Sequence, residues 1–127
     1  MDITDLPAHA LSSAIHTRQV SCREVMQATL ARIGAVNPIH NAIVSLRDGD
    51  ALLREADECD AQLKRGATPA GPIGWMHGMP QAIKDAAQTA GIRTTFGSPL
   101  LRDVWVTQLG TEGPMGRTVL EDRKSVV

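Results

Sequence analysis

The chain has 127 residues, 43% of them hydrophobic and 21% charged, a composition typical of one globular domain with a modest core and unlike that of a disordered segment. A formal net charge of −1 without any basic block excludes the electrostatic pattern of a nucleic-acid-binding protein. No stretch approaches the ~18 apolar residues of a membrane span, and the acidic N-terminus lacks the apolar core of a signal peptide, so we expect a cytoplasmic protein without a membrane partner.

The first predicted element is a helix that Thr4 or Asp5 can cap, with Pro7 in the first turn, where a missing N–H does no harm. We expect this helix to fade near residues 18–20. Apolar residues at helical spacing define its buried face: Leu6, Ala10, Leu11, Ala14 and Ile15.

A capping box opens the second predicted helix. Ser21 can accept a hydrogen bond from the Glu24 N–H, and the Glu24 side chain can reach back to the Ser21 N–H. Asn37-Pro38 is expected to stop the helix, because proline disfavours helical geometry in the residue before it. The inward residues are expected to be Val25, Thr29, Leu30, Ile33 and Val36.

Residues 41–46, with the sequence NAIVSL, are short, apolar and partly β-branched, and they predict a strand. A third helix follows, which Asp50 can cap and Gly66 can end, with Lys64 and Arg65 near its C-terminus where the helix dipole favours cations. Its inner side is expected to carry Leu52, Leu53, Ala56, Cys59, Ala61 and Leu63.

After a proline- and glycine-rich connection over residues 67–74, residues 79–83 predict a second short strand. Helices and strands in this order indicate an α/β protein rather than a helical bundle. The three aromatic residues are Phe96, Trp75 and Trp105, so the core has to be aliphatic. Cys22 and Cys59 lack motif partners and are expected to be reduced, structural thiols.

Lys84, directly after residues 79–83, is the candidate catalytic residue. Groups at strand ends sit on a rigid backbone beside an open edge. Lysine acts as a base only when neutral, and it can then take a proton from a serine hydroxyl. Strand alternation would point Asp85 to the opposite face, where it anchors the backbone instead of pairing with Lys84. The alternative is that Lys84 is an ordinary solvated surface residue.

The segment GPIGWMHGMPQAIKDAAQTAGIRTTFGS resembles the part of the amidase signature family that carries the family's catalytic lysine. The ordered match comprises Met76, His77, Gly78, Met79, Pro80, Lys84, Asp85, Gly91, Thr94, Thr95, Gly97 and Ser98. VNPIHNAIVSL is similar to the family's entry into its first strand, so the resemblance covers roughly residues 1–103. It implies a fragment of the amidase-signature fold, a mixed sheet covered by helices, in which the N-terminal helices precede a strand carrying the lysine.

The resemblance also implies a chemistry. Members of this family hydrolyse a carboxylic amide C–N bond with a serine nucleophile, a second serine joined by a cis peptide bond and a lysine base. By that correspondence Lys84 is the base and a small amide is the substrate, with no cofactor and no metal. Backbone N–H groups of a glycine-rich loop form the oxyanion hole.

The chain departs from the family in one respect, because it lacks the Gly-Gly-Ser-Ser-Gly-type stretch that carries both serines. Ser12 and Ser13 fall in a predicted helix, and Ser98 matches a family position other than the nucleophile. Residues 111–122, TEGPMGRTVLED, resemble a family segment found after the serine loop, which places a seam at residues 102–110.

These observations predict a single incomplete domain over residues 1–127, with a helical part (1–66), a lysine-bearing core segment (67–103) and a seam with a short tail (104–127). We expect this chain alone to be inactive, because the serines are missing. The alternative is a non-catalytic remnant or interaction fragment that forms a homo-oligomer or pairs with another chain through an uncovered strand edge. A metal site is not expected, since His9 and His16 lie two helical turns apart and His77 matches a structural position of the motif.

Overall fold

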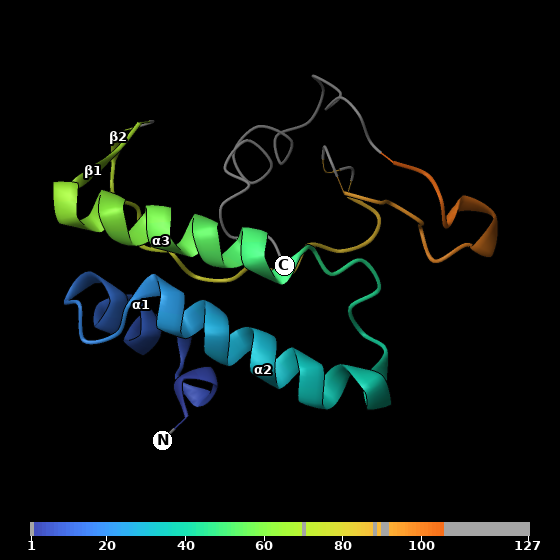
Figure 1. The fold of residues 1–127 in the computed structure, drawn as a ribbon, viewed down its shortest axis with the longest axis horizontal. Coiled ribbons are helices and arrows are strands. Elements are labelled where there is room, and N and C mark those ends of the chain that lie inside the picture. The colour runs from blue at the N-terminus through green and yellow to red at the C-terminus, as the bar shows by residue number, and fades with distance from the viewer. Residues whose placement is uncertain (1, 70, 88, 90–91, 106–127) are drawn as a thin grey trace.

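The computed structural model describes residues 2–69, 71–87, 89 and 92–105 (Figure 1). Three α-helices occupy the first half of this described part: α1 (Ala8–His16), α2 (Cys22–His40) and α3 (Gly49–Arg65). A 3-10 turn, η1 (Ile3–Asp5), precedes them; a short antiparallel pair, β1 (Ala67–Thr68) and β2 (Gly71–Pro72), and a second turn, η2 (Pro99–Leu101), follow. Figure 1 shows α2 and α3 side by side and antiparallel, with α1 beside the N-terminal end of α2.

The first helix begins later than the sequence predicts. The Asp2 side chain accepts from the Thr4 N–H at 2.9 Å and thereby caps η1, and the extended backbone of Pro7 separates this turn from α1. The expectation that Thr4 or Asp5 caps α1 is therefore wrong, because both residues belong to the separate 3-10 turn.

The predicted capping box of α2 is confirmed. The Ser21 hydroxyl accepts from the Glu24 N–H at 3.1 Å, and the Glu24 carboxylate accepts from the Ser21 N–H at 2.8 Å. That backbone N–H, followed by the Ser21 hydroxyl, lowers the pKa of the Glu24 carboxyl below its usual value.

The predicted stop at Asn37-Pro38 is wrong, because α2 continues through Pro38 to His40 and ends where Asn41 turns left-handed at φ 47°. A proline in the final turn removes the N–H of one residue only. The Asn37 carboxamide bonds both the N–H and the C=O of Ile43, at 2.8 and 2.9 Å, and so holds the chain that leaves the helix.

The third helix starts at Gly49, because Asp48 rather than Asp50 accepts from the Ala51 N–H at 2.8 Å. Its predicted end is confirmed. Gly66 adopts φ 75°, and its N–H donates to the carbonyl oxygens of Gln62 and Leu63.

Neither predicted strand forms among the described residues. Residues 41–46 contain a bend at Val44 and Ser45 and no strand, and within residues 79–83 Gln81 alone has an isolated bridge pairing. A strand requires a neighbouring chain to complete its hydrogen-bond ladder. Among the described residues the sheet is formed by β1 and β2, and it includes neither of these two segments.

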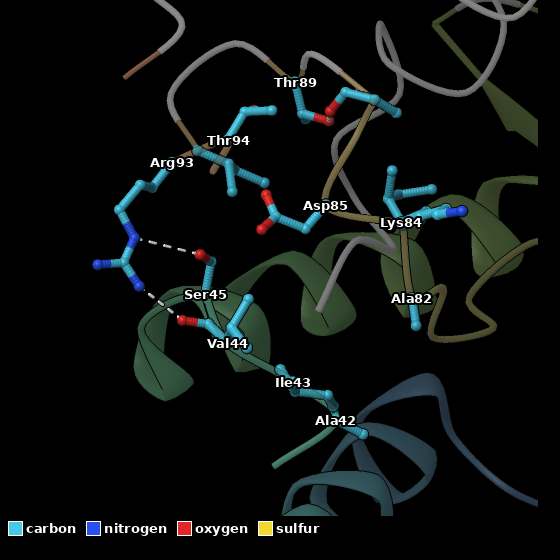
Figure 2. A pocket seen from close by; sticks show the side chains of 13 residues that line it. Ala42, Ile43, Val44, Ser45, Ala82, Lys84, Asp85, Thr89, Arg93 and Thr94 are labelled. Carbon is cyan, nitrogen blue, oxygen red and sulfur yellow. Dashed lines mark hydrogen bonds between the residues drawn. The ribbon is translucent and has the colours of Figure 1, made fainter. Parts of the chain in front are cut away.

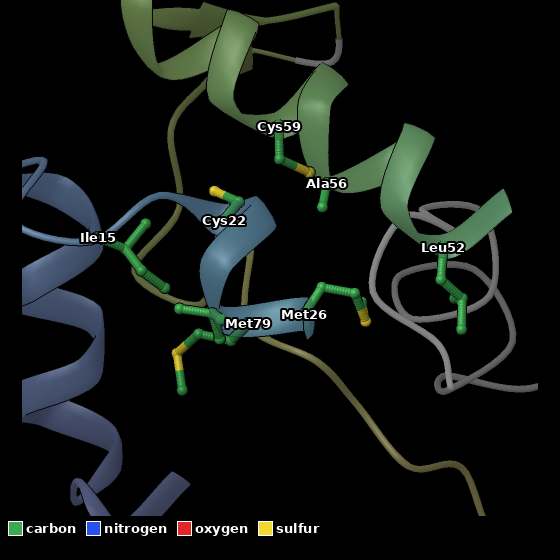
Figure 3. Packing of buried hydrophobic residues seen from close by; sticks show 8 residues of the cluster. Ile15, Cys22, Met26, Leu52, Ala56, Cys59 and Met79 are labelled. Atoms are coloured by element: carbon green, nitrogen blue, oxygen red, sulfur yellow. The ribbon is translucent and has the colours of Figure 1, made fainter. Parts of the chain in front are cut away.

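The core lies between the three helices and contains no aromatic side chain, as predicted (Figure 3). Its members come from α1, from α2, from α3 and from the chain after β2: Ile15, Cys22, Val25, Met26, Leu52, Ala56, Cys59 and Met79. Val36, expected to be inward, is 39% exposed, so the packed face of α2 ends before its last turns. Burial, with Asp60 beside the sulfur, raises the pKa of the Cys22 thiol, which makes it an inert core residue.

Residues 74–79 lie against the helices. Ser12 of α1 donates to the Trp75 carbonyl oxygen at 2.5 Å, and the His77 ring donates to the Cys59 carbonyl oxygen of α3 at 2.9 Å. Gly78 has φ 74°, and a Cβ there would overlap the Cys22 sulfur, so only glycine fits this approach. These contacts fix the path of the chain just before Lys84. No helix among the described residues has both the length and the apolar character that a membrane span requires.

Candidate functional site

Lys84 lies directly before a turn, five residues after the core residue Met79. Its carbonyl oxygen accepts from the N–H groups of Ala86 and Ala87 at 2.7 and 2.9 Å, so the chain turns directly after it. The side chain is exposed, and Figure 2 shows its amine pointing away from Arg93 and Ser45. Lys84 therefore follows residues 79–83 directly, but these residues do not form the strand that the sequence predicts before it.

Asp85 anchors the backbone, as the sequence predicts. Its carboxylate accepts from the Thr95 N–H at 2.6 Å and from the Thr95 hydroxyl, and its carbonyl oxygen accepts from the Phe96 N–H at 3.0 Å. The Thr95 hydroxyl and then the Thr95 N–H lower the pKa of the Asp85 carboxyl. No ion pair joins Lys84 to Asp85 among the described residues, and the two side chains leave the backbone on opposite sides (Figure 2).

The second half of the motif is a turn built around Thr95. The Thr95 hydroxyl accepts from the Gly97 N–H at 3.2 Å, and the Thr95 carbonyl oxygen accepts from the Ser98 N–H at 2.9 Å. Phe96 and Gly97 both take left-handed backbone angles, φ 51° and 69°. A left-handed backbone angle brings a Cβ atom close to the neighbouring backbone. Gly97 has no Cβ and avoids this steric penalty, whereas Phe96 does not.

Arg93 brings a distant segment to the site. Its Nη2 donates to the Val44 carbonyl oxygen at 2.7 Å and its Nε to the Ser45 hydroxyl at 3.3 Å, across 49 and 48 positions of sequence (Figure 2). Neither Arg93 nor Ser45 is expected at this site from the sequence. No local pattern identifies the partner of an isolated arginine so far along the chain.

A cavity of about 370 Å³ lies between these segments. Its wall combines residues 42–45, residues near the lysine and residues 92–94: Ala42, Ile43, Val44, Ser45, Ala82, Ile83, Lys84, Asp85, Ala87, Thr89, Ile92, Arg93 and Thr94. Lys84 and Asp85 therefore share a cavity with the hydroxyl groups of Ser45 and Thr89. Such polar groups among apolar side chains suit a small polar molecule.

The other predicted candidates take structural positions. Ser98 is not among the residues that line this cavity, so Lys84 and Ser98 do not meet there. The described residues contain no group of three or more histidine, cysteine, aspartate or glutamate side chains able to hold a metal ion. The tail segment at residues 111–122 and most of the predicted seam lie outside the described residues.

Comparisons with known proteins agree on one family. The family model described as Amidase matches residues 24–120, which include the predicted seam. A glutamyl-tRNA(Gln) amidotransferase subunit from Carboxydothermus hydrogenoformans is 39% identical over 103 residues, covering 81% of this chain and 20% of that protein. An acylamidase of Rhodococcus erythropolis is 34% identical over 98 residues, covering 77% of this chain and 20% of that protein.

A solved structure is also similar. Its description reads "An unexpected vestigial protein complex reveals the evolutionary origins of an s-triazine catabolic enzyme", and the match has a TM-score of 0.67 at 27% identity, covering 78% of this chain and 21% of that one. The observed arrangement is consistent with a partial α/β amidase fold. The chain spans about a fifth of the length of the curated relatives it matches. With a family model matched over most of its length, this chain belongs to the amidase family.

Proposed function

We propose that this chain contributes the base of a serine-lysine amidase, and that Lys84 is that base. The observation that carries the proposal is the engagement of Asp85. Its carboxylate is bonded to Thr95 and not to Lys84, so the negative charge next in sequence is directed into the turn and away from the amine. A carboxylate paired with the amine would favour its charged form, which cannot accept a proton.

The proposed reaction is cleavage of a carboxylic amide. In this reaction Lys84 takes the proton of a serine hydroxyl while the serine oxygen attacks the amide carbon. The C–N bond then breaks as the nitrogen receives a proton, and ammonia or an amine leaves. Water hydrolyses the acyl-serine and releases the carboxylic acid. Relatives named as part of an amidotransferase and as an acylamidase support a substrate with an acyl-nitrogen bond.

The serine has to come from outside this sequence, because no Gly-Gly-Ser-Ser-Gly-type stretch is present. Ser45 shares the cavity with Lys84, but its hydroxyl accepts from Arg93 and lies on the side away from the lysine amine. We therefore propose that the chain alone does not cleave amides.

A second candidate is a non-catalytic remnant or interaction fragment. The exposed large apolar side chains of the described part favour it, including Ile39 at 80% and Leu100 at 93% exposed. In that case Lys84 is an ordinary surface residue and no acyl transfer depends on it.

A chimera separates these candidates. In the Rhodococcus acylamidase, the 98-residue segment that matches this chain is replaced by the corresponding segment of this chain, and ammonia or amine release is measured. We expect activity that falls about 100-fold to 10,000-fold in Lys84→Ala, the range for loss of a general base. Lys64→Ala, at an exposed lysine of α3, is the matched control and leaves the rate unchanged.

Equal activity in the Lys84→Ala and Lys64→Ala chimeras would contradict the assignment of Lys84. The purified chain by itself is the second arm, and we expect it to release no ammonia from simple aliphatic or aromatic amides. Release by the chain alone that disappears in Lys84→Ala would contradict the proposed need for an external serine.

A further inference from the structure

His16, the last residue of α1, joins this helix to the chain that leads to Lys84. Its ring Nδ1 lies 2.8 Å from the Ser12 carbonyl oxygen, and its Nε2 lies 3.1 Å from the Gly74 carbonyl oxygen, 58 positions along the chain. Ser12, which is 8% exposed, adds a second link, because its hydroxyl donates to the Trp75 carbonyl oxygen at 2.5 Å. The imidazole ring is therefore held between two backbone carbonyl oxygens.

Two carbonyl oxygens place a demand on the protonation of the His16 ring. A carbonyl oxygen only accepts hydrogen bonds, and a neutral imidazole has one N–H and one bare nitrogen. A neutral ring at this position can donate to one of the two oxygens, and its bare nitrogen then faces the lone pairs of the other. The imidazolium form carries an N–H on both nitrogens and satisfies both contacts.

The Ser12 hydroxyl does not supply the missing donor. It lies 3.4 Å from Nδ1 of His16, but its single proton goes to the Trp75 carbonyl oxygen at 2.5 Å. The separation of 3.1 Å between Nε2 and the Gly74 carbonyl oxygen is that of a direct hydrogen bond and leaves no room for a bridging water. Both contacts therefore depend on protons of the ring itself.

His77 provides a contrast within the same part of the chain. Its Nε2 lies 2.9 Å from the Cys59 carbonyl oxygen, and among the described residues no second acceptor bonds its ring. A neutral ring with its proton on Nε2 satisfies that contact completely. The two histidines therefore differ in the number of protons that their folded contacts require.

Backbone groups rather than carboxylates surround the His16 ring. Among the described residues, no carboxylate forms a hydrogen bond or an ion pair with it, and the ion pairs all involve arginines. The other charged or titratable groups nearby in the chain are His9 of α1 and Arg18, whose guanidinium donates to a carbonyl oxygen of α3 at 3.2 Å. Asp60 of α3 accepts from two N–H groups at the start of α2. A protonated His16 therefore meets carbonyl oxygens and the C-terminal end of α1, where the helix dipole favours a cation.

We propose that His16 is a pH-sensitive latch, which holds residues 74–77 on α1 while both ring nitrogens carry protons and loosens when one proton is lost. The latched state binds one more proton than the loosened state. Latching is therefore favoured at low pH and weakens as the pH rises through the range in which histidine titrates. Because residues 74–77 precede Met79 and Lys84, the latch makes the anchoring of the lysine-bearing chain depend on pH. It does not require that Lys84 act as a base.

Hydrogen exchange and nitrogen-15 NMR of the imidazole rings test the latch on the full chain, over roughly pH 5 to 8, where histidine titrates. The reporter is the His77 N–H, which donates to the Gly74 carbonyl oxygen at 3.1 Å, beside the latch. Its protection, corrected for the intrinsic exchange rate at each pH, should fall at least about tenfold as the pH rises, which corresponds to one hydrogen bond from a charged group. The fall should coincide with the loss of a proton from the His16 ring.

His16→Gln removes the titrating ring but keeps a polar side chain, so the protection of the His77 N–H should become independent of pH. His9→Gln is the matched control, since His9 is an exposed histidine of the same helix, and it should preserve the fall. The Gly66 N–H, which donates to the Gln62 carbonyl oxygen at the end of α3, should keep the same protection throughout. Circular dichroism of both variants should show unchanged helix content.

Constant protection of the His77 N–H across this pH range in the unaltered chain would overturn the latch. A fall that persists in His16→Gln would also overturn it, because another group would then cause the pH dependence. A fall that follows the titration of the His77 ring instead of the His16 ring would assign the effect to the contact with Cys59 and would likewise contradict the proposal. If His16→Gln fails to fold, the coincidence of the two curves in the unaltered chain still decides.

Discussion

At the scale of single residues, Asp85 shows how one carboxylate can organise the site without taking part in chemistry. The Asp85 carboxylate accepts hydrogen bonds from the N–H and the hydroxyl of Thr95, a residue that is 8% exposed. The Asp85 carbonyl oxygen accepts from the N–H of Phe96. Because Thr95 also bonds the Gly97 N–H, the carboxylate fixes the turn that follows. The lysine next in sequence therefore projects from a backbone held on one side.

This arrangement predicts a pH dependence. The pKa of Asp85 is lowered in the folded chain, so its carboxylate stabilises the turn at pH above 3.8, the ordinary value for this side chain. The stabilisation is lost as the pH falls through the lowered folded-state value. The Thr95 amide resonance should report this transition with a midpoint below that of an unperturbed aspartate.

Asp85→Asn should abolish the transition at Thr95, because an amide does not titrate in this range. Asp50→Asn, an exposed first-turn residue of α3, is the control and should preserve it. A Thr95 transition that persists in Asp85→Asn would contradict the assignment.

Some residue-level features could be predicted because their rules are local. The Ser21–Glu24 capping box, the Gly66 helix end and the separation of Asp85 from Lys84 each depend on residues a few positions apart. The bond from Arg93 to Val44 spans 49 positions, and the contact of His77 with Cys59 spans 18. Such partners follow from how the whole chain packs, which a single sequence does not display.

At the scale of elements, the helices were predicted well and the strands were not. A helix closes its hydrogen bonds within one segment, so amphipathic spacing and caps are sufficient to locate it. Its exact ends are less certain, as Asp48 and Pro38 show. A strand depends on a partner segment, and residues 41–46 and 79–83 form no ladder among the described residues. Apolar and β-branched residues in a short segment are therefore not sufficient to predict that the segment pairs as a strand.

The capping box at the start of α2 is predicted to stabilise the folded chain. Ser21→Ala removes the acceptor of the Glu24 N–H and should lower the free energy of unfolding by about 1 kcal/mol. Ser13→Ala is the matched control, because Ser13 is exposed inside α1, where alanine is the better helix former. Urea denaturation followed by circular dichroism measures both. A Ser21→Ala midpoint equal to that of the unaltered chain would mean that the cap contributes nothing in solution.

At the scale of the whole molecule, the core and the candidate site are joined through one short segment. Residues 74–79 carry the bonds to α1 and α3, and Met79 is the member of the buried cluster that comes from outside the helices (Figure 3). Lys84 follows five residues after Met79. The position of Lys84 relative to the core therefore depends on packing that belongs to the helical half.

Met79→Ala tests this dependence. Truncating a buried methionine leaves a cavity and should lower the free energy of unfolding by about 2–5 kcal/mol, whereas Met79→Leu nearly conserves the volume and should cost less than about 1.5 kcal/mol. Met76→Ala, at a position 40% exposed, should have a smaller effect than Met79→Ala. Urea midpoints at constant m-value provide the comparison. Equal midpoints for Met79→Ala and Met76→Ala would show that residues 74–79 do not pack on the helices in solution, and the lysine would then have no fixed position relative to the core.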